Sequence, residues 1–151
     1  MEANRTELLA ECACFDLRKA MRVVSRMYDD FLRDADINVT QFSLLRLIRT
    51  ENAVSVSTLS RYMAMDRTSI TRALAPLQRN GLIDSCVGSD RRARIVSLTR
   101  KGNKLVANAE PKWNEAQRAL MHTIGDQRWT ALRTLLRDTT RLVRVRAETK
   151  N

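Results

Sequence analysis

The sequence predicts a mainly α-helical domain with long helices at both ends and a short β-hairpin between the fourth and fifth helices. Apolar residues recur at three- and four-residue steps over most of the 151 positions. Glycine and proline are scarce, with four and two residues, which disfavours a many-stranded sheet. Residues 94–98 instead have a strand pattern, with the β-branched Ile95 and Val96 followed by Ser97 and Leu98. The length suits one domain with its own core, over residues 1–151.

The N-terminal part predicts one long amphipathic helix over about residues 6–33. Its apolar side recurs at helical steps and consists of Leu9, Cys12, Ala13, Ala20, Val24, Met27 and Phe31. A second helix is expected from Thr40, a good N-cap residue, to about residue 50.

The middle of the chain predicts two shorter helices separated by a three-residue turn. Ser55 or Ser57 can cap the first of them, which ends near Met63. Asp66 caps the second, and Gly81 stops it. Its apolar side has the spacing i, i+3, i+4, i+7 and consists of Ile70, Ala73, Leu74 and Leu77. This pattern continues across Pro76, so one bent helix is expected.

A hairpin and two further helices complete the predicted order. Residues 82–87 and 94–98 have strand patterns, and the loop between them contains a glycine. Thr99 caps a fifth helix that runs to about residue 123, with a kink or a break at Pro111. A sixth helix is expected over about residues 126–147.

The net charge of +10 is concentrated in two segments. Residues 61–104 contain ten Arg or Lys and three Asp, a net charge of +7. Residues 128–150 add seven basic residues against two acidic ones. A concentrated positive stretch favours a polyanionic partner such as nucleic acid, whereas a solvated charged surface is the alternative that composition leaves open.

Two helices joined by a short turn and followed by a hairpin predict a winged helix-turn-helix. At about 100° per residue, Ile70, Leu74 and Leu77 point to one side of the fourth helix. The opposite side is mostly polar and basic, and consists of Thr68, Ser69, Thr71, Arg72, Ala75 and Arg79. A helix with such a face fits a DNA major groove, where Arg72 can bind guanine O6 and N7 or a phosphate.

The loop of the hairpin adds a second basic element, with Asp90 beside Arg91, Arg92 and Arg94. A wing beside a helix in the major groove lies near the flanking minor groove, whose focused negative potential attracts arginine. Asp90 would orient an arginine, because phosphate repels a carboxylate. The candidate DNA-binding residues are therefore Ser55, Ser57, Arg67, Thr68, Ser69, Thr71, Arg72, Arg79, Asp90, Arg91, Arg92 and Arg94.

These motifs resemble the MarR family of bacterial transcription regulators. The wing matches the family pattern D-x-R, an apolar strand and L-T-x-x-G at Asp90, Arg92, Val96, Leu98, Thr99 and Gly102. The stretch "SITRALAPLQRNGLI" resembles the family's recognition helix and its exit. Ser85 departs from the pattern, because many members carry arginine there.

The resemblance implies a homodimer on a pseudopalindromic operator in double-stranded DNA. Residues 40–100 would form the DNA-binding part, and residues 6–33 and 100–147 the dimerisation helices. Family members usually repress transcription, and a small-molecule ligand or oxidation releases the DNA. We therefore expect a repressor released by a small molecule, with two alternatives: a redox-sensing repressor, or a basic winged-helix module that binds DNA or RNA without sequence preference.

The redox alternative depends on Cys14. The stretch "CFDL" resembles the C-F-x-L of organic-hydroperoxide sensors in the same family, in which that cysteine is oxidised. Tyr28 falls where those sensors place a tyrosine that bonds the thiol, whereas Val39 and Arg18 replace two other aromatic positions. A thiol packed as a small hydrophobe is the structural alternative.

Other classes of protein are disfavoured. With one histidine and three cysteines, the sequence has no metal-ligand spacing, no phosphate-binding glycine loop and no catalytic triad, so neither an enzyme nor a cofactor is expected. No apolar run has membrane-spanning length. The N-terminus lacks the order of a signal peptide, and the odd cysteine count fits a reducing compartment, so we expect a cytoplasmic protein.

Overall fold

The computed structural model describes residues 12–88 and 93–148. The chain divides into two compact units, Met1–Asn114 and Glu115–Asn151. The first unit contains, in chain order, α2 (Ala13–Leu32), the 3-10 helix η1 (Arg33–Ala35), α3 (Val39–Glu51), β1 (Val54–Ser55), α4 (Val56–Met63), α5 (Arg67–Arg79), β2 (Ile83–Val87) and β3 (Arg94–Leu98). Helix α6 (Arg100–Ile124) begins in the first unit and ends in the second, which also contains α7 (Asp126–Glu148).

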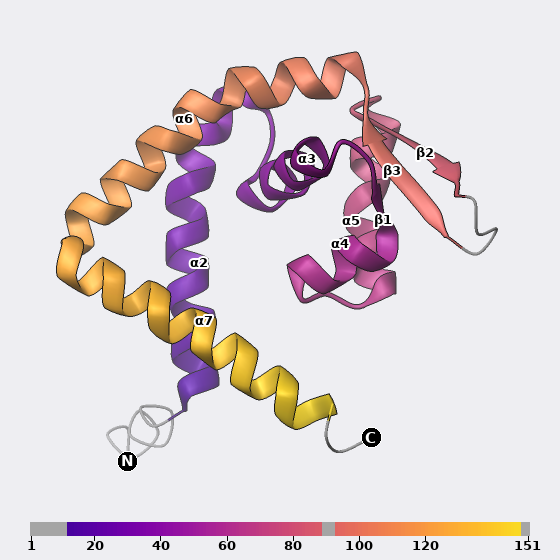
Figure 1. Ribbon diagram of the computed structural model, residues 1–151. Coiled ribbons are helices and arrows are strands. Elements are labelled where there is room, and N and C mark those ends of the chain that lie inside the picture. Colours follow the sequence, from indigo (N-terminus) through magenta and orange to yellow (C-terminus); the bar gives the residue numbers. More distant parts are fainter. Residues whose placement is uncertain (1–11, 89–92, 149–151) are drawn as a thin grey trace, which may run out of the picture. The chain divides into compact units, whose positions relative to one another are not determined.

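The predicted mainly helical fold with a winged helix-turn-helix is confirmed, and its sheet has one strand more than expected. The strands are antiparallel in the order β1-β3-β2 (Figure 1). In the predicted hairpin Ile83 pairs with Leu98, and on the other side of β3 Val54 pairs with Val96. Strand β1 has two residues, which is too short for an alternating pattern to reveal.

The helix starts follow side-chain caps, and one predicted cap is wrong. Helix α3 begins at Val39 because Asn38, and not Thr40, is its N-cap. The Gln41 amide donates to Asn38 Oδ1 at 2.9 Å, and the Asn38 amide donates to Gln41 Oε1 at 3.0 Å. This reciprocal capping box satisfies two backbone donors, whereas a cap at Thr40 would satisfy one.

The two helices of the middle segment end and begin as predicted. Of the two alternatives for α4, Ser55 is the cap, and it accepts the Thr58 amide at 3.0 Å. Helix α5 runs through Pro76 as one helix, and Gly81 follows it with a φ of 67°, in the left-handed region that glycine tolerates. Helix α6 is also continuous, so the predicted alternative of a break at Pro111 is wrong.

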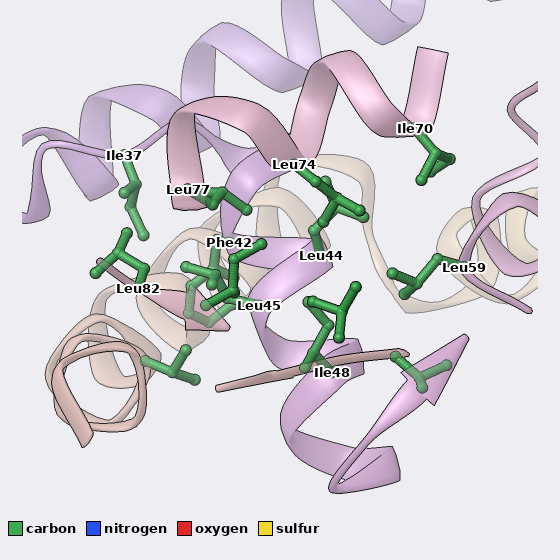
Figure 2. Packing of buried hydrophobic residues seen from close by; sticks show 14 of the residues in the cluster. Ile37, Phe42, Leu44, Leu45, Ile48, Leu59, Ile70, Leu74, Leu77 and Leu82 are labelled. Atoms are coloured by element: carbon green, nitrogen blue, oxygen red, sulfur yellow. The ribbon is translucent and has the colours of Figure 1, made fainter. Parts of the chain in front are cut away.

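The core of the first unit lies between α3, α5 and the sheet. Figure 2 shows Leu74 and Leu77 of α5 facing Phe42 and Leu44 of α3. The side chains of Phe42, Leu44 and Leu77 are fully buried, as is Val96 of β3. Burying such a side chain stabilises the fold by about 1.5–3 kcal/mol. This packing anchors the apolar side of α5 and leaves its polar side exposed.

Trp113 connects the first part of α6 to α3 and to the end of α2. Its ring stacks on Phe42 with centroids 5.9 Å apart, and lies 6.3 Å from the Tyr28 ring. The Arg46 guanidinium covers it at 4.2 Å from the ring centroid. The Arg46 guanidinium and the Trp113 ring thus form a favourable cation–π interaction.

Two helices expose many apolar side chains. Every residue from position 12 to position 23 on α2 is exposed, including Phe15, Leu17, Met21 and Val23. On α7 the exposed apolar residues are Leu132, Leu135, Leu136, Leu142, Val143 and Val145. Among the described residues, no helix is both long and apolar enough to cross a membrane.

Candidate DNA-binding surface

A tight turn joins α4 to α5 and sets the angle between them. Ala64 ends α4 in the left-handed conformation, with a φ of 52°. Its amide donates to the Arg61 carbonyl, and the Met65 amide donates to the Ser60 carbonyl at 3.0 Å. Asp66 then caps the next helix, so the turn has the three residues that the sequence predicted.

Asp66 is hydrogen-bonded twice to Ser69 at the start of α5. Its Oδ1 accepts the Ser69 amide at 2.8 Å, and its Oδ2 accepts the Ser69 hydroxyl at 2.6 Å. These bonds stabilise the ionised form, so the Ser69 hydroxyl and then the Ser69 amide hold the pKa of the Asp66 carboxyl below its ordinary value. The bonds of the cap are therefore stronger when the Asp66 carboxyl is ionised.

The polar side of α5 faces solvent, as the periodicity predicted. Thr68, Thr71, Arg72 and Arg79 are exposed, as is Arg67 at the first position of the helix. The Thr71 hydroxyl donates to the Arg67 carbonyl at 2.8 Å, so its proton is already used within the helix. Among the ion pairs of the described residues, none involves Arg72 or Arg79, and both guanidinium groups can meet an incoming anion.

Thr99 joins the end of α5 to the start of α6. Its hydroxyl donates to the Gly81 carbonyl at 2.7 Å and accepts the Gly102 amide at 3.0 Å. Its own amide donates to the Leu82 carbonyl at 3.1 Å. Thr99 is thus the predicted cap of α6, and these bonds also hold the base of the wing against the end of α5.

Of the predicted wing residues, only Arg94 lies among the described ones, since Asp90, Arg91 and Arg92 lie outside them. Arg94 is exposed, and its guanidinium donates to the Ser85 hydroxyl of β2. In the sequence, Ser85 is a departure from the family pattern, and no local signal predicts its contact with Arg94.

The serines predicted near the DNA lie at the start of α4. Ser55 is half-buried, pairs with Ile95 in the sheet and caps the helix, so it has a structural role. Ser57 is exposed in the first turn of α4.

The redox candidates Cys14 and Tyr28 are not brought together within the chain. Both lie on α2, where fourteen residues correspond to a rise of about 21 Å. Cys14 is exposed, whereas Tyr28 is buried beside Trp113, and this burial raises the pKa of its phenol. In the described part of the chain, no cluster of His, Cys, Asp and Glu could hold a metal ion.

A helix-turn-helix with a capped, exposed basic helix beside a β-wing defines a winged-helix DNA-binding protein. The profile of the MarR family matches residues 37–93. The M. tuberculosis transcriptional regulator MosR, solved in complex with DNA, is 31% identical with a TM-score of 0.82. The match covers 89% of this chain and 98% of that one. The chain belongs to the MarR family of transcription regulators, and it is not an enzyme.

Two more distant proteins are also similar. The Bacillus subtilis HTH-type transcriptional regulator YwoH is 22% identical over 111 residues, which are 74% of this chain and 81% of that protein. The Bordetella bronchiseptica protein BpsR, whose DNA binding is regulated by 6-hydroxynicotinic acid, is 22% identical with a TM-score of 0.77. That match covers 87% of this chain and 94% of that one, and at this identity it supports the fold alone.

Proposed function

We propose that the protein is a homodimeric repressor that binds a pseudopalindromic operator and is released by a small molecule. The observation that carries the proposal is the polar side of α5, where Arg72 and Arg79 are exposed on a helix whose opposite side is anchored in the core. A rigid helix of this kind can enter a major groove without further folding, so little conformational entropy is lost on binding.

The predicted roles divide between base reading and backbone binding. Arg72, near the middle of the exposed side of α5, would read a guanine through its two-pronged guanidinium. Thr68 and Arg67, in the first turn, and Arg79, in the last, would bind phosphates that fix the register of the helix. Arg91 and Arg92 would enter the flanking minor groove, with Asp90 orienting one of them.

The exposed apolar side chains of α2 and α7 support a dimer. Met21 and Val23 are 61% and 62% exposed, and on α7 Leu135 is 65% exposed. Apolar side chains gathered on a helix in this way are typical of a surface that a partner covers. A second copy is the partner of matching composition, and its twofold axis would place two recognition helices on one duplex.

A pocket between α3 and α6 supports release by a small molecule. It has a volume of about 300 Å³ and is lined by Phe42, Ser43, Arg46, Leu47, Thr50 and Trp113. The Arg46 guanidinium beside Trp113 would suit a small organic anion that replaces Glu110, now 3.6 Å away, as its ionic partner. The distant relative BpsR responds to a molecule of this chemistry.

Redox sensing by Cys14 is kept as a second candidate, because its thiol is exposed on the part of α2 where all side chains face solvent. A bond from Tyr28 to this thiol would have to come from a second copy, because Tyr28 of the same chain is too far along the helix.

Selection from a library of random duplexes tests the proposal directly. The expected result is enrichment of one pseudopalindrome, bound at least about a thousandfold more tightly than a random duplex of equal length at the same salt concentration. Tight binding with no enriched sequence would contradict it and would instead support the alternative of a basic module without sequence preference.

A further inference from the structure

Three side chains meet where the wing packs beside the recognition helix. Arg94 donates to the Ser85 hydroxyl twice, from Nη2 at 2.8 Å and from Nε at 3.1 Å. Gln78, near the end of α5, donates to the same oxygen from Nε2 at 3.4 Å. The Ser85 hydroxyl therefore links a residue of the recognition helix to an arginine of the wing.

The register of the sheet explains why these residues meet. Ser85 pairs with Val96, and Arg94 pairs with Val87, so Ser85 and Arg94 lie on the same face of the sheet. That face also carries Val96 and Ile83, which are buried in the core beside α5. A groove of about 170 Å³ lies at this junction, lined by Val56, Thr71, Leu74, Ala75, Gln78, Ile83, Ser85, Arg94 and Val96.

The Arg94 guanidinium is not paired with a carboxylate among the described residues. Its anchor is a neutral hydroxyl. Asp84, the acidic residue of β2, pairs with Ser97 and lies on the opposite face of the sheet. Two of the five N–H groups of Arg94 bind Ser85, which leaves three for another acceptor.

We propose that Arg94, held by the Ser85 hydroxyl, binds a phosphate between the recognition helix α5 and the wing. This inference depends on the proposed function, in which α5 enters the major groove and the wing tip reaches the flanking minor groove. The backbone that separates the two grooves passes the junction of α5 and the wing, where Arg94 lies. Arg94 thus differs from Arg91 and Arg92, because it positions the protein on the backbone and does not enter the minor groove.

The two hydrogen bonds to Ser85 reduce the conformational entropy that Arg94 loses on binding. A free arginine on the surface loses much rotamer freedom when it binds a phosphate, whereas an arginine already fixed by two hydrogen bonds loses less. Ser85 is therefore a positioning residue for the cation. Its hydroxyl fixes the guanidinium of the neighbouring strand beside β2.

The test combines three variants with a duplex enriched from the random library. Arg94→Ala should weaken binding about tenfold on the enriched and on a random duplex alike. It should also make the negative slope of log K against log salt shallower by about one. Ser85→Ala keeps the charge, so it should weaken binding less and leave the salt slope unchanged. Arg100→Ala removes an equal charge from the exposed start of α6 and serves as the matched control.

A scan of single neutral methylphosphonates along the same duplex locates the contact. One substitution, in the backbone between the major groove bound by α5 and the adjacent minor groove, should weaken the wild type but not Arg94→Ala. Ser85→Ala should show a smaller effect of the same methylphosphonate than the wild type. If the hydroxyl had only a structural role, the effect would equal that of the wild type. Melting temperatures equal to that of the wild type would establish that the exposed Arg94 and the half-buried Ser85 are not required for folding.

The failure of this inference differs from the failure of the proposed function. If the wild type enriches no sequence, the proposed function fails. If the wild type enriches an operator but Arg94→Ala behaves like Arg100→Ala, or remains sensitive to the same methylphosphonate, the assignment of Arg94 is overturned. A change in base preference within the minor groove on Arg94→Ala would also overturn it.

Discussion

Gly102 packs so closely against Leu82 that a side chain at position 102 would overlap the Leu82 backbone. A β-carbon built on Gly102 would collide with the Leu82 carbonyl oxygen and would lie 3.0 Å from the carbonyl carbon. The same carbonyl accepts the Thr99 amide, so Leu82 cannot move away without breaking that bond. The close approach joins the first turn of α6 to the start of the wing.

Gly102→Ala should therefore destabilise the fold by about 1–3 kcal/mol through overpacking. Glycine to alanine inside a helix normally stabilises by about 1 kcal/mol, so the expected sign is the reverse of the usual one. Urea unfolding measures the change. Lys104→Ala, at an exposed position of the same helix, is the control and should stay within about 0.5 kcal/mol. Equal stability of Gly102→Ala and the wild type would refute the close approach.

The cap of the recognition helix should give a pH dependence. Because the Ser69 bonds lower the pKa of Asp66 in the folded protein, its ionised carboxylate adds stability above the ordinary value of 3.8, and this stability is lost as the pH falls through the lowered pKa. The difference between the melting temperatures of the wild type and Asp66→Ala should be largest near pH 7 and should begin to shrink below about pH 4, as the pH falls toward the lowered pKa. A difference that stays constant down to pH 3 would show that the charge of Asp66 contributes nothing.

Arg72→Ala should weaken binding to the enriched duplex by about 1–3 kcal/mol and relax selectivity at one position of each half-site. The reason is that the exposed Arg72 would lose its two bonds to a guanine edge. Fluorescence anisotropy with base-substituted duplexes measures both effects, with Lys104→Ala as the control. An equal loss on enriched and random duplexes would mean that Arg72 binds a phosphate and reads no base.

Cys14 gives a prediction that separates the two candidate release mechanisms. If the redox mechanism operates, stoichiometric organic peroxide should release the wild type from the duplex and leave Cys14→Ser bound. The physical reason is that oxidation puts a polar group on the part of α2 proposed to pack against a second copy. Retention of both proteins would exclude peroxide sensing by Cys14 and leave the pocket beside Trp113 as the release site.

The periodicity of the sequence predicted the helices and the polar side of α5 because burial of Ile70, Leu74 and Leu77 requires that spacing. It failed at Thr40, because Asn38 and Gln41 form a reciprocal cap that single-residue preferences do not reveal. It also missed β1, although Val54 and Val56 alternate with serines, because two paired residues give too short a pattern.

Helical periodicity predicted the site residues that lie on the polar side of α5, but it did not predict contacts between different elements. The hold of Ser85 on Arg94 joins two strands and the recognition helix, and it follows from the register of the sheet. The stacking of Trp113 on Phe42 joins residues far apart in the chain and has no local signal. Contacts of this kind depend on tertiary packing, which local sequence patterns do not encode.

In the proposed complex, a dimer presents two recognition helices to half-sites about one helical turn apart. Inserting about half a turn of DNA, ~5 base pairs, between the half-sites of the enriched duplex would place them on opposite faces of the DNA. The most direct measurement compares the affinity of the protein for the original and the lengthened duplex at one salt concentration. Affinity for the lengthened duplex should fall to about that for random DNA, whereas an unchanged affinity would show that one dimer does not bind both half-sites.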